Sequence, residues 1–457
     1  MRWSIVGCTL AAACRIDFDP LIDGTVFRDA AVSPEAVFGV HGDTGSQLGT
    51  AVAVGTDGSI ALAGAFQNSL PMGTTPTSAG GYDGFVASLR ADGRLRWVRA
   101  FGGTADDFAR AVAIDLAGNI VVTGDFGGTA DFGTGPLTAL GEADIFVASY
   151  APDGTPRWSR RYGDTVTGST YGSELGNAIA VGSNQIYVAG QFAGTVDFGT
   201  GPLTMSATGD DIVLFALDPQ GTTAWAHHYG SNQINKVAGI TADATGVAFT
   251  GYFQGTADLG GAPLANNGGN EIFVAAYDPG GNHLWSRSFG GNGLDFGRGI
   301  ARDAAGNAYV TGYYETTVDF GAGPSTTASI DAFVLSLSPT GAYNWSHTFG
   351  ATCAKGQDVA VAGDRVYVVG EFDTPIAAPM LTSTGPGDAF VIAYDLAGNV
   401  TSMQAYGGAS YDSAQGVAVL PAGAVVVAGK TGVGDDCATT TGIVGEEDMF
   451  VVRFPMQ

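Results

Sequence analysis

The sequence predicts an all-β fold: a seven-bladed β-propeller in which each blade is a sheet of four antiparallel strands. Three observations predict it. Glycine accounts for 72 of the 457 residues, and the excess of Gly, Thr, Val and Ala over Leu, Lys and Glu favours strands and tight turns. Apolar residues do not recur with the 3.6-residue period of an amphipathic helix, which argues against α/β folds. The chain also repeats one pattern about every 60 residues, as propellers do.

The repeat contains four strand signals in a fixed order. The copy Ala109–Gly163 opens ARAVAIDLAGNIVVTGDF, continues GGTADFGTGPLTALGEADIFVASY and closes APDGTPRWSRRYG, with turns between the strand signals. One such unit cannot bury both of its faces, so neighbouring copies are expected to stack around an axis. Seven copies are recognised by the acidic residue that opens the third strand: Asp83, Asp144, Asp211, Glu271, Asp331, Asp388 and Asp448.

Two motifs that recur within the repeat indicate architecture. Asp131-Phe132-Gly133 has the letters of the magnesium-binding tripeptide of protein kinases, but it returns as Asp197-Phe198-Gly199 and Asp319-Phe320-Gly321. A catalytic Asp is not needed once per blade, so we interpret the motif as a turn between the second and third strands. A tryptophan in the fourth strand is expected to fill the gap toward the adjacent blade: Trp97, Trp158, Trp225, Trp285 and Trp345.

The front of the chain is expected to complete the ring. The seventh copy has no fourth strand after Phe450, whereas residues 36–42, AVFGVHG, match the outer strand of the other copies in shape. We therefore expect residues 36–42 to be the outer strand of the last blade and to close the ring by strand pairing, which removes the open edges. The single propeller domain then spans residues 36–457.

The first 35 residues are typical of export and attachment. Arg2 precedes the apolar run WSIVGCTLAAAC, so residues 1–14 are interpreted as a signal peptide with a lipoprotein-box-like end and Cys14 as the lipid attachment site. Residues 15–35 form an acidic tether. The box has Ala11 where Leu is usual, which leaves a plain secretory signal, or a mis-assigned start and a disordered tail, as alternatives. We expect an exported protein, either a lipoprotein of the outer membrane or cell surface or an extracellular protein, with membrane contact only through the lipid.

The repeat also resembles a known family. AVAIDLAGNIVVTGDF and GIARDAAGNAYVTGYY, together with the Asp-x-Phe-Val strand starts, are similar to the SBBP repeats, a family named for seven-bladed β-propellers. The resemblance covers roughly residues 36–457. It implies a secreted or surface-attached bacterial propeller, usually without an assigned reaction, and it carries over no catalytic residue.

A candidate ligand-binding ring comes from one position at the start of each first strand. If the first strands line the axis, these side chains lie near the mouth of the central channel, where cations and amides would attract an anion, a carboxylate-bearing ligand or a sugar. The alternative is that Asp106, Asp107 and Asp295 simply pair with the arginines. The ring consists of Arg110, Asn177, Lys236, Arg298, Gln357 and Gln415, with Thr50 at the same position of the first copy.

The loops offer a second kind of site. The connections between the second and third strands vary most among the copies, and they are expected to emerge on one face with the connections between blades, where partner recognition is common. Cys353 and Cys437 lie in such connections about one blade apart, and export permits a disulfide between them.

Composition argues against several function classes. With 44 acidic and 19 basic residues, the chain has a net charge of −25, which repels nucleic acid. The four cysteines lack metal-site spacing, and the acidic residues that open the third strands are expected to cap backbone N–H groups rather than bind a metal. We expect no metal and no cofactor.

These observations favour a non-catalytic, surface-anchored or secreted propeller that acts as a monomeric binding scaffold for a protein or a glycan. The alternative is a propeller-type enzyme, a glycan lyase or hydrolase with its site at the channel mouth. An enzyme needs two convergent titratable groups, and the repeat offers no pair that stands out from its copies. A purely structural spacer is the third hypothesis.

Overall fold

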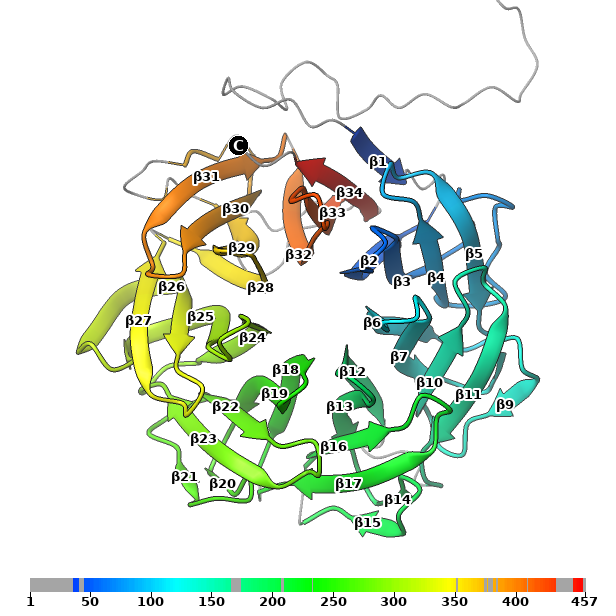
Figure 1. Ribbon diagram of the computed structural model, residues 1–457, viewed down its shortest axis with the longest axis horizontal. Coiled ribbons are helices and arrows are strands. Elements are labelled where there is room, and N and C mark those ends of the chain that lie inside the picture. Colours follow the sequence, from blue (N-terminus) through cyan, green and yellow to red (C-terminus); the bar gives the residue numbers. More distant parts are fainter. Residues whose placement is uncertain are drawn as a thin grey trace, which may run out of the picture.

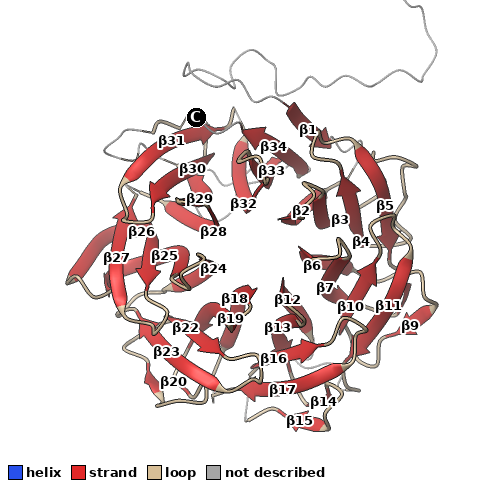
Figure 2. Cartoon of the chain, in the orientation of Figure 1, coloured by secondary structure: helices blue, strands red, loops and turns tan. Residues whose placement is uncertain are grey.

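The seven blades stand around a central axis in the computed structural model (Figures 1 and 2). The structure describes residues 36–40, 45–165, 174–206, 209–231, 233–350, 352–373, 376, 381–383, 385–408, 410–432 and 447–454. Within these residues all of the helical or extended structure is β-strand, and seven of the sheets have four strands each. The predicted fold class is confirmed.

The innermost strand of each blade faces the axis. These strands carry the candidate ring, and each contains a β-bulge against its neighbour. They are β2 (Gln47–Val54), β6 (Asp107–Ile114), β12 (Leu175–Val181), β18 (Asn235–Asp243), β24 (Phe296–Arg302), β28 (Ala354–Ala362) and β32 (Tyr411–Val419).

The second and third strands form the buried middle of each blade. The second strands are β3 (Ile60–Phe66), β7 (Ile120–Phe126), β13 (Ile186–Phe192), β19 (Gly246–Phe253), β25 (Ala308–Asp319), β29 (Arg365–Phe372) and β33 (Val425–Gly432). The third strands are β4 (Asp83–Leu89), β10 (Asp144–Tyr150), β16 (Asp211–Leu217), β22 (Glu271–Tyr277), β26 (Pro324–Leu337), β30 (Asp388–Asp395) and β34 (Asp448–Phe454). Most of these strands are buried on both faces because each core cluster lies between two neighbouring blades.

The outer strands are β5 (Leu95–Phe101), β11 (Pro156–Tyr162), β17 (Thr223–Tyr229), β23 (His283–Phe289), β27 (Tyr343–Phe349), β31 (Val400–Tyr406) and β1 (Ala36–Val40). β1 lies beside β34 in the sheet of order β1-β34-β33-β32, with Ala36 opposite Arg453 and Val40 opposite Met449 (Figure 1). Residues 41 and 42 of the expected closing segment lie outside the described residues. That β1 stabilises the ring stays a prediction.

Small hairpins occupy three of the connections between the second and third strands. Sequence analysis treated these connections as loops and missed the hairpins, because each strand has only two or three residues. The hairpin strands are β8 (Thr129–Asp131) with β9 (Pro136–Thr138), β14 (Thr195–Asp197) with β15 (Pro202–Thr204), and β20 (Thr256–Ala257) with β21 (Leu264–Ala265).

The Asp-Phe-Gly motif is a turn, as predicted. The carboxylate of Asp131 accepts hydrogen bonds from the backbone N–H groups of Gly133 (2.7 Å) and Gly135 (3.1 Å). Phe132 is buried and stacks on Phe146 with ring centroids 4.5 Å apart. The same two carboxylate bonds recur at Asp197 and Asp319.

Five tryptophans fasten their outer strands to the next blade. Trp158 donates from Nε1 to the carbonyl of Pro219 (3.0 Å), and Arg160 donates from Nε to the carbonyl of Gly221 (2.9 Å). Gly221 has a φ of 79° and lies against the indole, where a Cβ would come within 2.7 Å of the ring. We call this arrangement the tryptophan clamp. It recurs at Trp97, Trp225, Trp285 and Trp345, so the packing role predicted for these residues is confirmed.

The acidic residues that open the third strands cap backbone N–H groups, as expected. Asp83, for example, accepts from Ala79, and Asp144 accepts from Leu140 and Gly141. Among the described residues, no group of three or more His, Cys, Asp or Glu side chains is arranged to hold a metal ion.

Several of these carboxylates face a second carboxylate from the next blade. Oε2 of Glu271 and Oδ2 of Asp295 each lie 2.6 Å from the place where a Cβ would stand on Gly290, so the two oxygens are within about 5 Å of each other. Burial, and then the charge of Glu271, raise the pKa of Asp295 to about 7. Asp83 and Asp107 lie on either side of Gly102 in the same way. We call these arrangements junction carboxyl pairs.

Other predictions fall partly or wholly outside the described residues. Cys353 is buried and disulfide-bonded, but Cys437 is not described, so the pairing of Cys353 with Cys437 stays a prediction. The expected signal peptide (residues 1–14), with Cys14, and the tether (residues 15–35) also lie outside the described residues. Within the part of the chain that is described, no helix has the length and apolarity needed to cross a membrane.

Candidate functional site

The candidate site is the central cavity, which is lined by the first strands of all seven blades. Its volume is about 400 Å³. The strands reach the axis closely enough to form one cavity because a glycine in each second strand leaves room for the bulged first strand. At Gly124, for example, a Cβ would overlap the carbonyl of Phe108.

A β-bulge on each first strand turns one residue toward the cavity. Between Ala109 and Ala111 the pairing with β7 skips Arg110, and the same skip occurs at each of the other six blades. Bulges commonly re-aim a side chain next to a functional site. The bulge residues that line the cavity are Thr50, Arg110, Asn177, Ala238, Arg298, Gln357 and Gln415.

One member of the expected ring was therefore assigned to the wrong residue. In the fourth blade the bulge lies at Ala238, while Lys236 lies two residues earlier, opposite Tyr252, and does not line the cavity. The hydrogen-bond register, not the residue type, decides which residue bulges, and the sequence shows only the residue type. The other ring residues line the cavity, and that they bind a ligand stays a prediction.

The ring side chains bond to their own second strand or to the next blade. Arg110 donates from Nε to Oδ1 of the buried Asp125, so the alternative in which Arg110 pairs with Asp106 or Asp107 is wrong, although Arg110 does pair with an acid. Burial raises the pKa of Asp125, and the Arg110 charge opposes that shift. Asn177 donates from Nδ2 to the side chain of Gln191 (2.7 Å).

Two ring side chains also join neighbouring first strands. Thr50 donates to the carbonyl of Ala109 in the next blade (2.6 Å), and Asn177 donates to the carbonyl of Val237 (3.1 Å). In contrast, Gln357 and Gln415 bond within their own blades: the Gln357 amide donates to Glu371 (3.4 Å), and the Gln415 amide donates to Ser413 (2.6 Å). Substitution of the two glutamines is therefore the gentler way to alter the ring.

Arg298 has a different environment from Arg110, although both occupy the bulge position. Its Nη2 donates to the hydroxyl of Tyr313 (3.2 Å), its guanidinium carbon lies 5.4 Å from the centre of that ring, and its buried Nε has no hydrogen-bond partner. Tyr313 occupies the second-strand place that Asp125 has in its blade. The alternative pairing of Arg298 with Asp295 does not occur among the described contacts.

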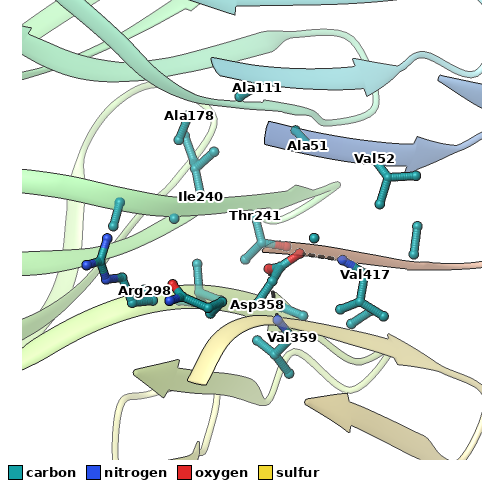
Figure 3. Close-up of a pocket in the computed structure, with 18 of the residues that line it drawn as sticks. Ala51, Val52, Ala111, Ala178, Ile240, Thr241, Arg298, Asp358, Val359 and Val417 are labelled. Carbon is teal, nitrogen blue, oxygen red and sulfur yellow. Dashed lines mark hydrogen bonds between the residues drawn. The ribbon is translucent and has the colours of Figure 1, made fainter. Parts of the chain in front are cut away.

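Asp358 is the one carboxylate among the described residues that line the cavity. It accepts hydrogen bonds from the N–H groups of Val359 (2.8 Å) and Val417 (2.9 Å), and burial raises its pKa to about 6 (Figure 3). In Figure 3 the guanidinium of Arg298 points away from Asp358. The Val417 bond ties the sixth blade to the seventh.

Sequence analysis missed the second-strand residues that support the ring. Each of the second strands that supply them contains a glycine, a variable residue and then Phe or Tyr. The supporting residue is the variable one, and that position was the signal available in the sequence. The supporting residues are Asp125, Gln191, Tyr252, Tyr313 and Glu371.

The fold and this ring define a seven-bladed β-propeller with a polar central opening. Residues 284–320 match the family model of the SBBP repeat, described as a beta-propeller repeat. The resemblance found in the sequence is therefore confirmed: this propeller carries an SBBP repeat.

The chain is also similar to a named bacterial protein. It is 26% identical over 338 residues to "Regulatory protein FlaEY" of Caulobacter vibrioides. The match covers 67% of this chain and 34% of the relative, so the chain spans about a third of that protein's length.

Solved structures resemble the chain over most of its length at low sequence identity. A chain of a structure entitled "Crystal Structure of Mitotic Checkpoint Complex" has a TM-score of 0.47 at 11% identity, covering 97% of this chain and 98% of that one. Sqt1 from Chaetomium thermophilum has a TM-score of 0.42 at 12% identity, covering 93% and 100%. The fold stated above is established by the strand pairing of this chain itself.

Proposed function

We propose that the protein is a non-catalytic binding scaffold that holds a ligand at the mouth of its central cavity. The supporting observation is that seven separate strands each turn one bulge residue toward the same cavity, and that six of the seven residues are polar. The proposed ligand is a glycan or part of an exported protein. The proposal takes the protein to act as a monomer.

A binding scaffold is proposed rather than an enzyme for a physical reason. Three carboxylates at the ring are already engaged: Asp125 with the Arg110 guanidinium, Asp358 with two backbone N–H groups, and Glu371 with the Gln357 amide and the Ser413 hydroxyl. A glycan lyase or hydrolase needs an acid and a base that are free to exchange protons with a substrate. The distant similarity to a protein named as regulatory agrees with a binding role and specifies no ligand.

A binding array tests the proposal. The protein without its predicted signal peptide (residues 1–14) is applied to immobilised glycans and exported proteins. Every probe that binds is tested again with the double variant Gln357→Ala/Gln415→Ala. We expect at least a tenfold loss of affinity in the double variant with an unchanged melting temperature.

The matched control is Leu116→Ala. Leu116 is 72% exposed in the turn that follows β6, at the end of the strand away from the ring. It should leave binding unchanged. Positives that are equally strong in the glutamine variant, or an array without any positive, contradict the proposal.

A further inference from the structure

One sector of the cavity mouth combines unpaired cations with aromatic rings. It extends over the fourth, fifth and sixth blades, on and just outside the bulge ring. We call it the cationic–aromatic sector. It consists of Lys236, Tyr252, Phe296, Arg298, Tyr313 and Lys355.

The six side chains form a continuous series. Lys236 lies directly opposite Tyr252 in the pairing of β18 with β19. The Tyr252 ring contacts Phe296 edge to face with centroids 4.6 Å apart, and Phe296 stacks on Tyr313 at 4.7 Å. Nζ of Lys355 lies 5.3 Å from the centre of the Tyr313 ring. Side chains from three blades are therefore joined by direct contacts.

The cations of this sector have no carboxylate at ion-pair distance, although the Lys236 charge opposes the raised pKa of Asp210 and Glu371 lies opposite Lys355 in the pairing of β28 with β29. Within the described part of the chain, no carboxylate oxygen lies within 4.0 Å of a side-chain nitrogen of Lys236, Arg298 or Lys355. By contrast, Arg110, Arg161 and Lys430 each have a carboxylate partner. Arg298 and Lys355 are stabilised by the face of Tyr313 instead.

Lys236 and Arg298 are half-buried and Lys355 is buried. Such a cation without an ion-pair partner is costly, and an anion that binds beside Arg298 would supply a counter-ion. The chain as a whole has a charge of −25, so a densely charged polyanion would be repelled by the rest of the surface. A ligand with one carboxylate on each uncharged ring avoids that repulsion. The aromatic rings suit the apolar face of such a ligand, and the neutral ring amides Asn177 and Gln357 suit its hydroxyl groups.

From these contacts we propose that the cationic–aromatic sector binds a carboxylate-bearing sugar, with Arg298 pairing with the carboxylate. Tyr252 and Phe296 contact the sugar ring, and Lys236 and Lys355 add to the positive potential. This inference rests on the proposed function, since it specifies the ligand class for the same cavity mouth.

Titration calorimetry on the mature protein tests the inference with paired probes. The probes are trigalacturonate, trimannuronate and triguluronate, each compared with its methyl ester, which keeps the rings and removes the charge. We expect at least one acid to bind and its ester to bind at least tenfold more weakly. Arg298→Gln should weaken the acid to the level of the ester.

A paired arginine outside the cavity provides the control. Arg94→Gln removes the charge of an exposed arginine whose Nη1 lies 3.7 Å from Oδ2 of Asp92, and it should leave acid binding within twofold of the native value. Lys355→Met serves as a second test variant if Arg298→Gln does not fold, and it too should reduce acid affinity several-fold. Melting temperatures establish that each variant is folded.

Three results would overturn the inference. They are equal affinity for acid and ester, undiminished acid binding in Arg298→Gln and Lys355→Met, and inorganic phosphate binding as tightly as the sugar acid. If no acid binds while glutamine-dependent array positives remain, the sugar-acid inference fails and the proposed function stands. If neither a sugar acid nor any array probe binds, the inference and the proposed function both fail.

Discussion

Phe132 and Asp131 illustrate how single residues hold a connection against its blade. The Phe132 side chain is 2% exposed and contacts three phenylalanine rings, those of Phe101, Phe126 and Phe146. Asp131 is exposed, and its carboxylate orders the turn through two N–H bonds. Most of the stabilisation should therefore come from the phenylalanine.

This division predicts unequal effects of two neighbouring substitutions. Phe132→Ala should lower the free energy of unfolding by about 3–5 kcal/mol, because it leaves a cavity among aromatic rings. Asp131→Ala should cost about 1 kcal/mol, the usual value of a lost turn bond. Urea denaturation followed by fluorescence measures both. A larger effect for Asp131 than for Phe132 would show that the carboxylate does more than form a turn.

The sequence predicted most of the ring residues but not their partners. Arg110, Asn177, Arg298, Gln357 and Gln415 occupy corresponding places in the repeat, so the period alone finds them. Their partners depend on the bulge, which shifts the pairing by one residue and decides which second-strand side chain lies alongside. No residue type signals that shift, and for this reason Asp125 was missed and Lys236 was misplaced.

At the scale of elements, the junctions between blades combine apolar cores with buried acids. The junction carboxyl pairs arise because the start of one third strand meets the start of the next first strand. Burial is the first cause of the raised pKa values, which are about 6 for Asp83, about 7 for Asp107 and about 7 for Asp295. Sequence analysis found the third-strand acids but could not pair them, since their partners belong to the following copy.

The junction carboxyl pairs predict that the protein gains stability on mild acidification. A carboxyl whose pKa is higher in the folded state binds its proton more tightly there, so its contribution is present at low pH and lost as the pH rises through the folded pKa. For Asp295 the window runs from about 4 to about 7. Urea midpoints measured between pH 8 and pH 5 should therefore rise as the pH falls.

Glu271→Gln tests one junction directly. The amide can still accept the Asn267 N–H bond (2.7 Å in the native chain) and can donate to Asp295 without a second charge. We expect a gain of roughly 1–2 kcal/mol at pH 8 and little change at pH 5. The control Asp278→Asn alters a solvent-exposed turn, and its stability should follow the native pH profile without a gain at pH 8. A variant whose stability follows the native pH profile would contradict the assignment.

At the scale of the whole molecule, the ring contains one blade assembled from both ends of the described chain. β1 pairs with β34, about 400 residues later in the sequence, whereas the other outer strands pair with a strand of their own copy. The blade number and the strand order were predictable because every copy repeats the same four signals. The two-residue and three-residue hairpin strands were not, since they are too short to carry a periodic pattern.

Two truncations test the contribution of β1 to the ring. Removal of residues 1–30 should leave the melting temperature unchanged, because it keeps β1. Removal of residues 1–42 should lower it by several degrees, because the edge of β34 loses its partner. Differential scanning calorimetry compares the two proteins. Equal melting temperatures would mean that β1 does not stabilise the ring.

The tryptophan clamp has a consequence for how such a molecule changes over evolutionary time. In each of the five clamps the tryptophan lies in one copy and the Pro-x-Gly or Leu-x-Gly turn that it contacts lies in the next. The tryptophan of one copy could therefore contact the turn of any other copy that followed it. If recombination duplicated or deleted one whole copy between clamped neighbours, every new contact between blades would still have both the tryptophan and the turn. The number of blades in the encoded ring could change in this way while the contacts between blades stayed the same.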